Sequence, residues 1–206
     1  MANNKKIVSL PRAVALDLLN SIFVKKRTLD QAIFTCKTFS TLTPSDKGFA
    51  RLLAVTVIRR AGQIDNVIQC FLRTGMPSGA RDFKHILRLA CAEILFLDGK
   101  PHAAVDSAVT LVEAKKLPHY KGLANAVLRR LASEGKTKLK RFPVRLNYPS
   151  WLIDSWTNHY GLDKAEKIFE ACVQEPMLDI SVKSNPSYWA KKLDGQLLAS
   201  GSIRRK

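Results

Sequence analysis

The sequence predicts an all-α protein, a compact helical bundle followed by a small helical connector and the start of an α/β subdomain. Three observations lead to this prediction. Apolar residues recur at three- and four-residue intervals from about residue 11 to residue 131, which is the spacing of one buried helix face. No segment in that range alternates apolar and polar residues over the length of a strand. Strict alternation comes only in LDISVK, at residues 178–183.

Start signals place the first helices. The first is expected to begin at Pro11, because proline suits the first helical turn. The second is expected to begin at Thr28 or Asp30. Thr43 and Pro44 form an N-cap followed by a first-turn proline, which predicts a third helix directly after them.

Glycine and proline then separate the remaining helices of the bundle. Gly62 allows a bend before the next apolar segment, and the RTGMPSG segment at 73–79 is a turn by composition. A strongly apolar helix is expected at about 80–97. Another helix follows Pro101, and the last follows Pro118.

The predicted domain organisation has three parts. Residues 1–135 are the helical domain and residues 136–148 are a basic linker with an extended part. Residues 149–206 are the helical connector and the incomplete start of the next subdomain. The linker is proposed because SEGKTKLKRFPVRLNY contains glycine, proline and a concentration of positive charge.

Within the connector, short helices are expected after Pro149 and after Gly161, and a half-buried strand at 178–183. The stretch that carries Trp189, Leu193 and Leu197 is expected to be helical. A single strand cannot form a sheet, so this part is expected to belong to a subdomain whose remainder lies elsewhere.

Charge is the strongest compositional signal. The chain of 206 residues has a formal net charge of +17 and a sequence pI near 10.0. Residues 1–145 hold 26 Lys and Arg against 10 Asp and Glu, whereas residues 146–206 hold 8 against 7. Such an excess predicts an anionic partner for the first part of the chain, and nucleic acid is favoured over an acidic protein or a membrane surface.

Targeting and membrane signals are lacking. The apolar run near the N-terminus is short, is interrupted by Asp17 and precedes no small-residue cleavage site. No segment reaches the roughly 18 apolar residues that a membrane span requires. We expect a soluble, cytoplasmic protein with no membrane partner.

The cysteines and histidines give no support for a metal or redox centre. No CxxC pair exists, and Cys36, Cys70, Cys91 and Cys172 are interpreted as buried free thiols. The histidines form no HxxxH or HExxH pair and are interpreted as surface or capping residues; they are His85, His102, His119 and His159.

Catalytic motifs are missing as well. The glycines form neither GxGxxG nor GxxxxGK, no serine lies in a nucleophile elbow, and the acidic residues are scattered. We therefore predict no catalytic, metal-binding or cofactor-binding residues in this chain.

Basic residues that decorate the helices are the candidate RNA-binding residues. Arg81, Lys84 and Arg88 are spaced i, i+3, i+7, so they share one helix face and can meet successive phosphates. The alternative is that such a face only keeps the protein in solution. The predicted RNA-binding set is Lys5, Lys6, Arg12, Arg81, Lys84, Arg88, Lys121, Arg129, Arg130, Lys138, Lys140 and Arg141.

Residues 121–130, KGLANAVLRR, combine both roles. Leu123, Val127 and Leu131 form the predicted buried stripe, while Asn125 lies on the opposite, polar face. Two roles for Asn125 stay open, a hydrogen bond to the turn at Pro101 or a contact with RNA. Gly122 is expected to permit the close approach of a neighbouring helix.

Residues 86–131 also resemble a known family. The segment ILRLACAEILFLDGKPHAAVDSAVTLVEAKK, followed by KGLANAVLRRL, is similar to the NusB-like domain. It looks most like the form at the N-terminus of bacterial ribosomal RNA cytosine-C5 methyltransferases of the RsmB (Sun/Fmu) type. The resemblance extends more loosely back to Arg12 and forward through YPSWLIDSW at 148–156.

The resemblance implies an α-helical fold that binds structured RNA. In the full methyltransferases a Rossmann-like domain follows, which binds S-adenosylmethionine and uses two cysteines to methylate cytosine. This chain has no glycine-rich cofactor loop, and Thr35-Cys36 matches the catalytic Thr-Cys context only as a dipeptide in the wrong domain. S-adenosylmethionine is therefore expected only in a catalytic domain that this chain lacks, and the chain is expected to end within the connecting subdomain.

Three functions remain open. The first is the RNA-binding N-terminal region of an rRNA methyltransferase, which positions ribosomal RNA and does no chemistry itself. The second is a stand-alone NusB-like transcription antitermination factor, bound to RNA and to a ribosomal protein. The third is a helical protein–protein adaptor. Residues 136–206 favour the first, because a stand-alone factor has little use for them. The oligomeric state and the target nucleotide are not indicated.

Overall fold

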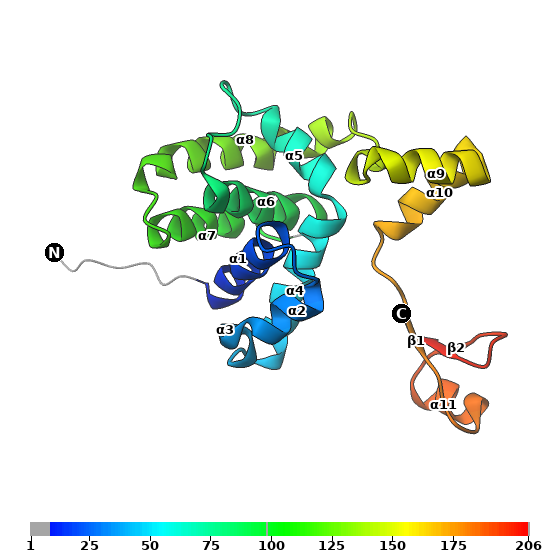
Figure 1. Cartoon of the computed structure of the whole chain (residues 1–206). Coiled ribbons are helices and arrows are strands. Elements are labelled where there is room, and N and C mark those ends of the chain that lie inside the picture. The colour runs from blue at the N-terminus through cyan, green and yellow to red at the C-terminus, as the bar shows by residue number, and fades with distance from the viewer. Residues whose placement is uncertain (1–8, 98, 206) are drawn as a thin grey trace. The chain divides into compact units, whose positions relative to one another are not determined.

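The computed structural model describes residues 9–97 and 99–205, and Figure 1 shows its helices in chain order. The predicted helical bundle is confirmed. Its helices are α1 (Leu10–Phe23), α2 (Leu29–Thr35), α3 (Lys37–Ser40), α4 (Pro44–Arg59), α5 (Ala61–Gln69), α6 (Arg81–Phe96), α7 (Pro101–Ala114), the 3₁₀ helix η1 (Pro118–Tyr120) and α8 (Lys121–Leu139).

Two compact units divide the chain, residues 1–169 and residues 170–206. The first unit thus contains the bundle, the predicted linker and most of the two following helices, α9 (Ser150–Tyr160) and α10 (Leu162–Cys172). The predicted domain limits at 135 and 148 stay predictions.

The threonine caps form as the sequence indicates. The Thr28 hydroxyl accepts from the Gln31 N–H, and the Gln31 side chain accepts from the Thr28 N–H, which completes a capping box at the start of α2. Thr43 caps α4 by accepting from the Asp46 N–H, and Pro44 takes the first helical position.

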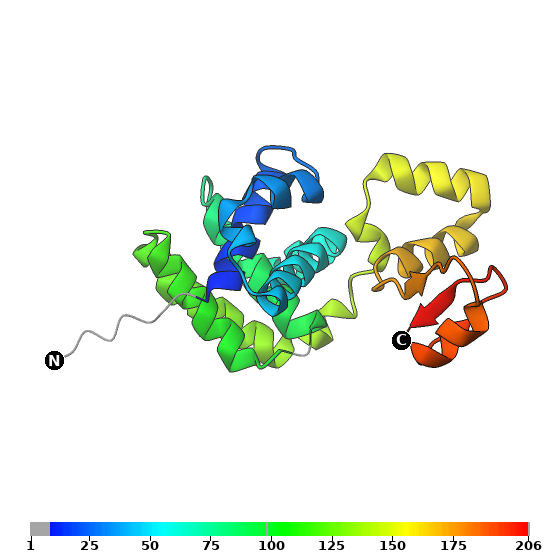
Figure 2. The ribbon, with the colours of Figure 1, turned by 90° about the horizontal axis from the view of Figure 1, so that it is seen from below.

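Helix α6 lies at the centre of the bundle and packs against α1, α4, α5, α7 and α8. Its apolar residues Phe83, Ile86 and Leu87 are fully buried. Helices α7 and α8 lie side by side against it, as the views in Figures 1 and 2 both show. The buried stripe predicted for α8 is confirmed, since Val127 and Leu131 are in the core.

Helix α8 is longer than the sequence suggested. It continues to Leu139, so the first residues of the predicted linker are helical. The prediction ended the helix too early because it took Gly135 as a linker glycine. In the structure Gly135 is buried, and it lies so close to α6 that a Cβ there would be 3.0 Å from Leu95 Cδ2. Glycine marks a close helix contact at this position, not the end of the helix. The close approach expected at Gly122 is wrong, because no atom lies within 4 Å of a Cβ placed there.

The segment after α8 docks on α5. The 3₁₀ helix η2 (Val144–Asn147) passes so close to Gly62 that a Cβ would be 1.9 Å from the Leu146 carbonyl oxygen. The Gln63 N–H donates to Asn147 Oδ1 at 2.9 Å, and Asn147 Nδ2 donates to Gln63 Oε1 at 3.0 Å. Gln63 Nε2 also donates to the Phe142 carbonyl oxygen at 2.8 Å. Gly62 was expected to allow a bend, but the break between α4 and α5 falls at Arg60. Gly62 lies inside α5 and makes room for η2.

Helices α9 and α10 start close to the predicted positions and meet around a small aromatic cluster. The ring centroids of Tyr148 and Phe169 are 4.6 Å apart, and those of Trp156 and Phe169 are 5.3 Å apart. The Tyr148 hydroxyl donates to the Phe169 carbonyl oxygen at 2.9 Å. This cluster gives the connector helices an apolar centre of their own.

The second unit contains a small antiparallel sheet in the order β1-β3-β2. Its strands are β1 (Leu178–Ile180), β2 (Gln196–Leu197) and β3 (Ile203–Arg205). Asp179 lies opposite Arg204, and the guanidinium donates to both carboxylate oxygens at 2.7 Å. The predicted strand is therefore real, although it is shorter than expected.

The helix expected around Trp189, Leu193 and Leu197 is only partly correct. Helix α11 (Pro186–Lys192) ends before Leu197, which lies in β2. Asp194 adopts a left-handed φ of 48°, a conformation that stops a helix and turns the chain into the strand.

None of the described helices is both long enough and apolar enough to cross a bilayer.

Gly62→Ala is expected to lower the free energy of unfolding by about 1–3 kcal/mol, because the added methyl group collides with the Leu146 carbonyl oxygen. Urea unfolding followed by circular dichroism measures this change. Gly122→Ala is the matched control: it adds the same methyl group in open space on a helix and is expected to stabilise by about 0.5–1 kcal/mol. Equal effects of the two substitutions would contradict the docking of η2 on α5.

Candidate nucleic-acid interface

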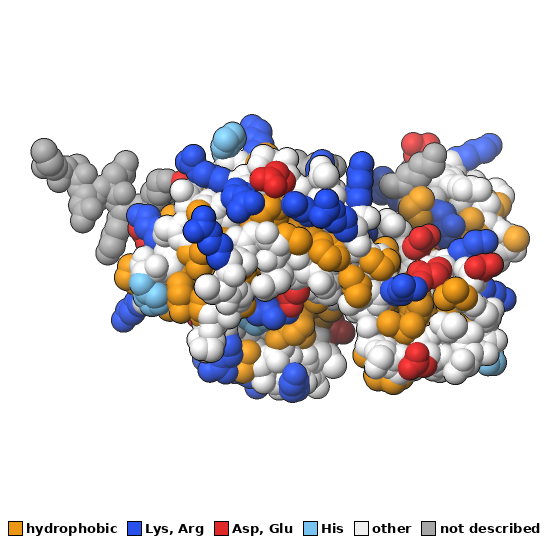
Figure 3. All heavy atoms as spheres, turned by 90° about the horizontal axis from the view of Figure 1, so that it is seen from above, with side chains coloured by type: hydrophobic (Ala, Val, Ile, Leu, Met, Phe, Trp, Pro, Cys, Tyr) orange, Lys and Arg blue, Asp and Glu red, His pale blue; other side chains and the backbone are white. Residues whose placement is uncertain are grey.

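The largest concentration of positive charge lies on α8 and the residues directly after it. Residues 121–145 contain eight Lys and Arg and one acidic residue, Glu134. Figure 3 shows Lys and Arg side chains spread over the face of the bundle that carries this segment. Most of these cations are exposed; they are Lys121, Arg129, Arg130, Lys136, Lys140, Arg141 and Arg145.

Arg129 and Lys136 are seven residues apart on α8, so they lie on one side of the helix, two turns apart. Neither forms an ion pair with any described residue. Lys136 was not among the predicted RNA-binding residues, although Lys138, Lys140 and Arg141 of the same predicted linker were. Lys140 and Arg141 follow directly after the end of α8 and are exposed as well.

Other predicted cations on this face have weak internal partners. Lys121 pairs with Glu113 of α7, and both side chains are about half exposed. Arg130 lies 3.7 Å from Glu134 and over the Phe71 ring at 5.3 Å from its centroid. Exposed pairs of this kind contribute little to stability, so these side chains can exchange a carboxylate for a phosphate at small cost.

Arg12 has an internal role. From α1 its guanidinium reaches Glu93 in the middle of α6 and binds both carboxylate oxygens, with Nε at 2.8 Å from Oε2. The Glu93 side chain is only 6% exposed. The guanidinium also lies over the Phe49 ring. This arrangement leaves Arg12 to stabilise the fold, and we do not include it in the interface.

Arg88 is also internal. It does share a helix face with Lys84, but that face is turned toward α5, where both residues bind Asp65. Arg88 donates to the two Asp65 carboxylate oxygens at 2.7 and 2.6 Å, and its side chain is only 8% exposed. The predicted row of three phosphate contacts is therefore reduced to Arg81, which is exposed at the start of α6.

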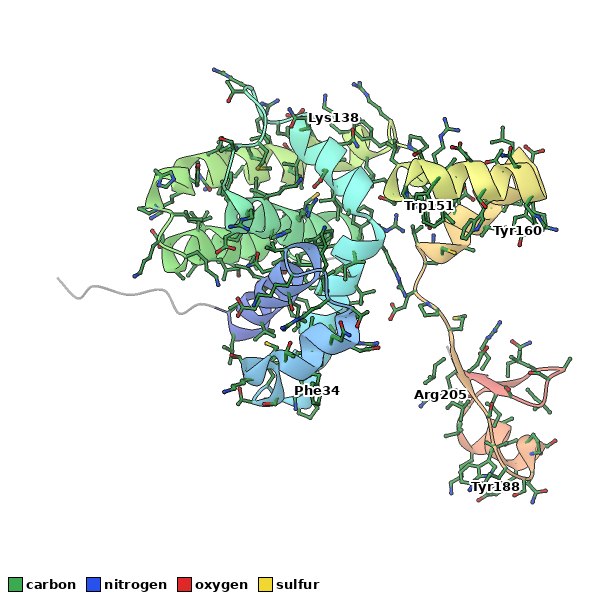
Figure 4. The ribbon with its side chains drawn as sticks, in the orientation of Figure 1. Phe34, Lys138, Trp151, Tyr160, Tyr188 and Arg205 are labelled. Atoms are coloured by element: carbon green, nitrogen blue, oxygen red, sulfur yellow. The ribbon has the colours of Figure 1, made fainter. Side chains whose placement is uncertain are left out.

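The remaining predicted residues lie at different places. Lys138 is half-buried near the end of α8 and is labelled in Figure 4. Lys5 and Lys6 lie outside the described residues. Phe34, which is 92% exposed on α2, is labelled at the opposite end of the bundle from Lys138, so it is not part of the basic face.

Asn125 lies beside Arg129 on α8, and its Oδ1 accepts from Arg129 Nε at 3.1 Å. Both residues line a groove of about 680 Å³ between α7 and α8. Pro101 lines the α7 side of the groove, but Asn125 makes no hydrogen bond to the Pro101 turn among the described residues. The structure therefore supplies no evidence that Asn125 holds the Pro101 turn, and its contact with RNA stays a prediction.

His85 corrects the expectation that every histidine is at the surface. It is buried on α6, 3.3 Å from Arg88 Nη1 and stacked on the Phe23 ring. Burial, and after it the charge of Arg88, lower the pKa of His85 from 6.5 to about 4. Burial alone would raise the pKa of Asp65, but its hydrogen bonds with Arg88 and Lys84 outweigh this and hold it below 3.8.

The four cysteines are free thiols that differ in burial. Only Cys91 is buried, whereas Cys70 and Cys172 are exposed, so the expectation of four buried thiols is wrong. Burial raises the pKa of the Cys91 thiol, which keeps it protonated and unreactive. Over residues 9–97 and 99–205, no cluster of His, Cys, Asp and Glu has the arrangement of a metal site.

The model of the NusB family matches residues 9–133 of this chain. Among curated proteins, the ribosomal RNA small subunit methyltransferase B of Xanthomonas campestris pv. campestris is 29% identical over 170 residues, which cover 81% of this chain and 37% of that protein. The probable ribosomal RNA small subunit methyltransferase B of Synechocystis sp. is 26% identical over 179 residues, covering 83% and 40%. The chain thus spans about two fifths of the length of these relatives.

Solved structures show the same fold. NusB of T. maritima superposes with a TM-score of 0.54 at 21% identity, covering 65% of this chain and 99% of that chain. PH0851 superposes with a TM-score of 0.59 at 16% identity, covering 96% of this chain and 48% of that chain.

The burial of His85 predicts a loss of stability in mild acid. Its folded pKa of about 4 lies below the ordinary 6.5, so the unfolded state binds a proton first. The stability that neutral His85 contributes is complete above pH 6.5 and is lost as the pH falls toward 4, by at most about 3 kcal/mol. Urea midpoints measured across this range follow the loss.

His85→Gln is the comparison variant, because its amide oxygen can still accept from Arg88 and does not titrate. We expect its urea midpoint to vary much less between pH 6.5 and pH 4. The Asp65 carboxyl does not interfere, because its stabilising effect is lost only at lower pH. A variant that loses stability as steeply as the native chain would contradict the assignment to His85.

Proposed function

The chain belongs to the NusB family, and from this premise we propose that it binds ribosomal RNA as the N-terminal region of an rRNA cytosine-C5 methyltransferase. In this role it positions the RNA and does no chemistry itself. The observation that carries the proposal is the basic face of α8 and the following turn, where Arg129, Lys136 and Arg141 are exposed and have no acidic partner among the described residues. Structured RNA presents closely spaced phosphates that such a face can contact.

The extent of similarity supports a methyltransferase region over a stand-alone antitermination factor. The two methyltransferase relatives align with 81% and 83% of this chain, well past residue 133, whereas NusB of T. maritima covers 65%. The docking of η2 on α5 also makes the segment after the bundle part of the same compact unit. A basic face suits an acidic protein as well as RNA, and it is the match to the NusB family that favours RNA over the acidic partner of a helical adaptor, the third possibility.

The described residues do not fit S-adenosylmethionine. Strand β1 is followed by α11 without an intervening glycine, and the sheet is a short antiparallel one. A cofactor cradle of the Rossmann type needs a parallel strand that leads through a glycine-rich turn into a helix. We therefore assign no methyl-transfer step to the residues of this chain.

Replacing both Arg129 and Arg130 with alanine is expected to weaken RNA binding about tenfold at moderate salt and to lower the slope of log affinity against log salt by about 1–2. Transcripts that tile the small-subunit rRNA are the probes, with duplex DNA and heparin as comparators. Circular dichroism is expected to stay unchanged, because both side chains are exposed.

Lys164→Ala with Lys167→Ala is the charge-matched control, since both residues are exposed on α10. It is expected to leave RNA affinity within about twofold, because isolated surface charges contribute little at this ionic strength. If the control weakens binding as much as the α8 variant, or if affinity does not change with salt, the basic face of α8 is not the RNA site.

A further inference from the structure

The groove between α7 and α8 combines an apolar part with a basic edge on α8. Val105 and Val109 of α7 and Ala132 of α8 form the apolar part. Arg129 and Asn125 line the α8 side and are joined by their hydrogen bond. A surface made only for phosphates would have no need of a hollow of about 680 Å³, because phosphate oxygens are contacted from the outside of the nucleic acid.

We propose that this groove takes an unpaired nucleobase of single-stranded RNA, while Arg129 holds an adjacent phosphate at its edge. The inference rests on the proposed RNA-binding function and makes it more specific, because it adds base recognition to phosphate contact. A base in a duplex is stacked and paired, so only a loop, bulge or single strand can insert one.

The polar groups of the groove suit the edge of a base. Asn125 Oδ1 accepts from Arg129, and the Asn125 Nδ2 amide has no hydrogen-bond partner among the described residues. It therefore has two N–H donors for the ring nitrogens and carbonyl oxygens of a base. The Ser133 hydroxyl also lines the groove, although it already donates to the Arg130 carbonyl oxygen and is left mainly as an acceptor.

The charge distribution favours a base over an acidic peptide. No Lys or Arg of α7 is among the residues that line the groove, so its α7 side lacks a cation to hold the carboxylate of an acidic peptide. The positive side chain of Arg129 lies on the α8 side. A nucleotide satisfies both sides, because its base is neutral and its phosphate can stay at the α8 edge.

The groove is also large enough. Its volume falls within the range of about 300–1,000 Å³ that is typical of small-molecule sites, enough for a base with its ribose. Apolar side chains such as Val105 and Val109 give a base a surface on which to lie and exclude water from its edge contacts.

The test compares RNA strands that have the same charge but differ in their bases. The probes are labelled single strands of about nine nucleotides, each with one kind of base, and an abasic ribose-phosphate strand of the same length. We expect the native chain to bind the preferred strand about tenfold more tightly than the abasic strand, and more tightly than the same strand in a duplex.

Ala132→Phe fills the groove without touching the core, because Ala132 is exposed. It is expected to remove most of the difference between the strand with bases and the abasic strand, and Asn125→Ala to reduce it. Neither variant is expected to change the salt slope, because no cation is lost. Ala114→Phe, at the exposed end of α7 and outside the groove, is the control and should keep the difference.

The outcomes distinguish RNA binding by the chain from recognition of a base in the groove. If the native chain binds abasic and natural strands equally and with the expected salt dependence, RNA binding stands and the base site is overturned. The base site is also overturned if Ala132→Phe and Ala114→Phe behave alike. If the native chain binds neither these strands nor the rRNA transcripts, both the proposed function and the base site fail.

Discussion

Charge buried in α6 is the constraint on which the bundle depends. Glu93 and Arg88 lie on the central helix and are almost completely enclosed, at 4% and 7% exposure. A buried charge without a partner destabilises a fold by about 3–5 kcal/mol, so each needs an opposite charge from another helix. Arg12 of α1 supplies one and Asp65 of α5 the other. The positions of α1 and α5 around α6 are thus tied to two ion pairs as well as to apolar packing.

The same constraint sorts the positive charges of the chain into two groups. Arg12 and Arg88 stabilise the interior and are unavailable to a partner. The cations of α8 lie on the outside of the bundle, where Glu134 is the one acidic residue between positions 121 and 145. The net charge of +17 therefore understates how unevenly the accessible charge is distributed. Along α8 and the turn after it, Arg129, Lys136 and Arg141 offer exposed positive charge that has no acidic partner among the described residues.

Sequence reasoning found the helices because their signals are local. Periodicity located the buried stripe of α8, and Thr28 and Thr43 marked helix starts that the structure confirms. Partners that are distant in the sequence could not be predicted in this way. Arg12 and Glu93 are 81 positions apart, and no local pattern links them. Gly135 was misread for a similar reason, because a glycine at a close helix contact and a glycine in a linker look alike without the neighbouring Leu95.

The docking of η2 on α5 gives the basic face a property that charge alone does not supply. Residues 140 and 141 lie between the end of α8 and Phe142, whose carbonyl oxygen is held by Gln63. Gln63 is also bound to Asn147, so the turn is fixed at both ends. Cations on a flexible linker would lose conformational entropy when they bind phosphates, whereas these lie on a backbone that is already ordered. The amide pair of Gln63 and Asn147 therefore helps to hold Lys140 and Arg141 on an ordered backbone, which under the proposed function lowers the entropic cost of binding phosphates.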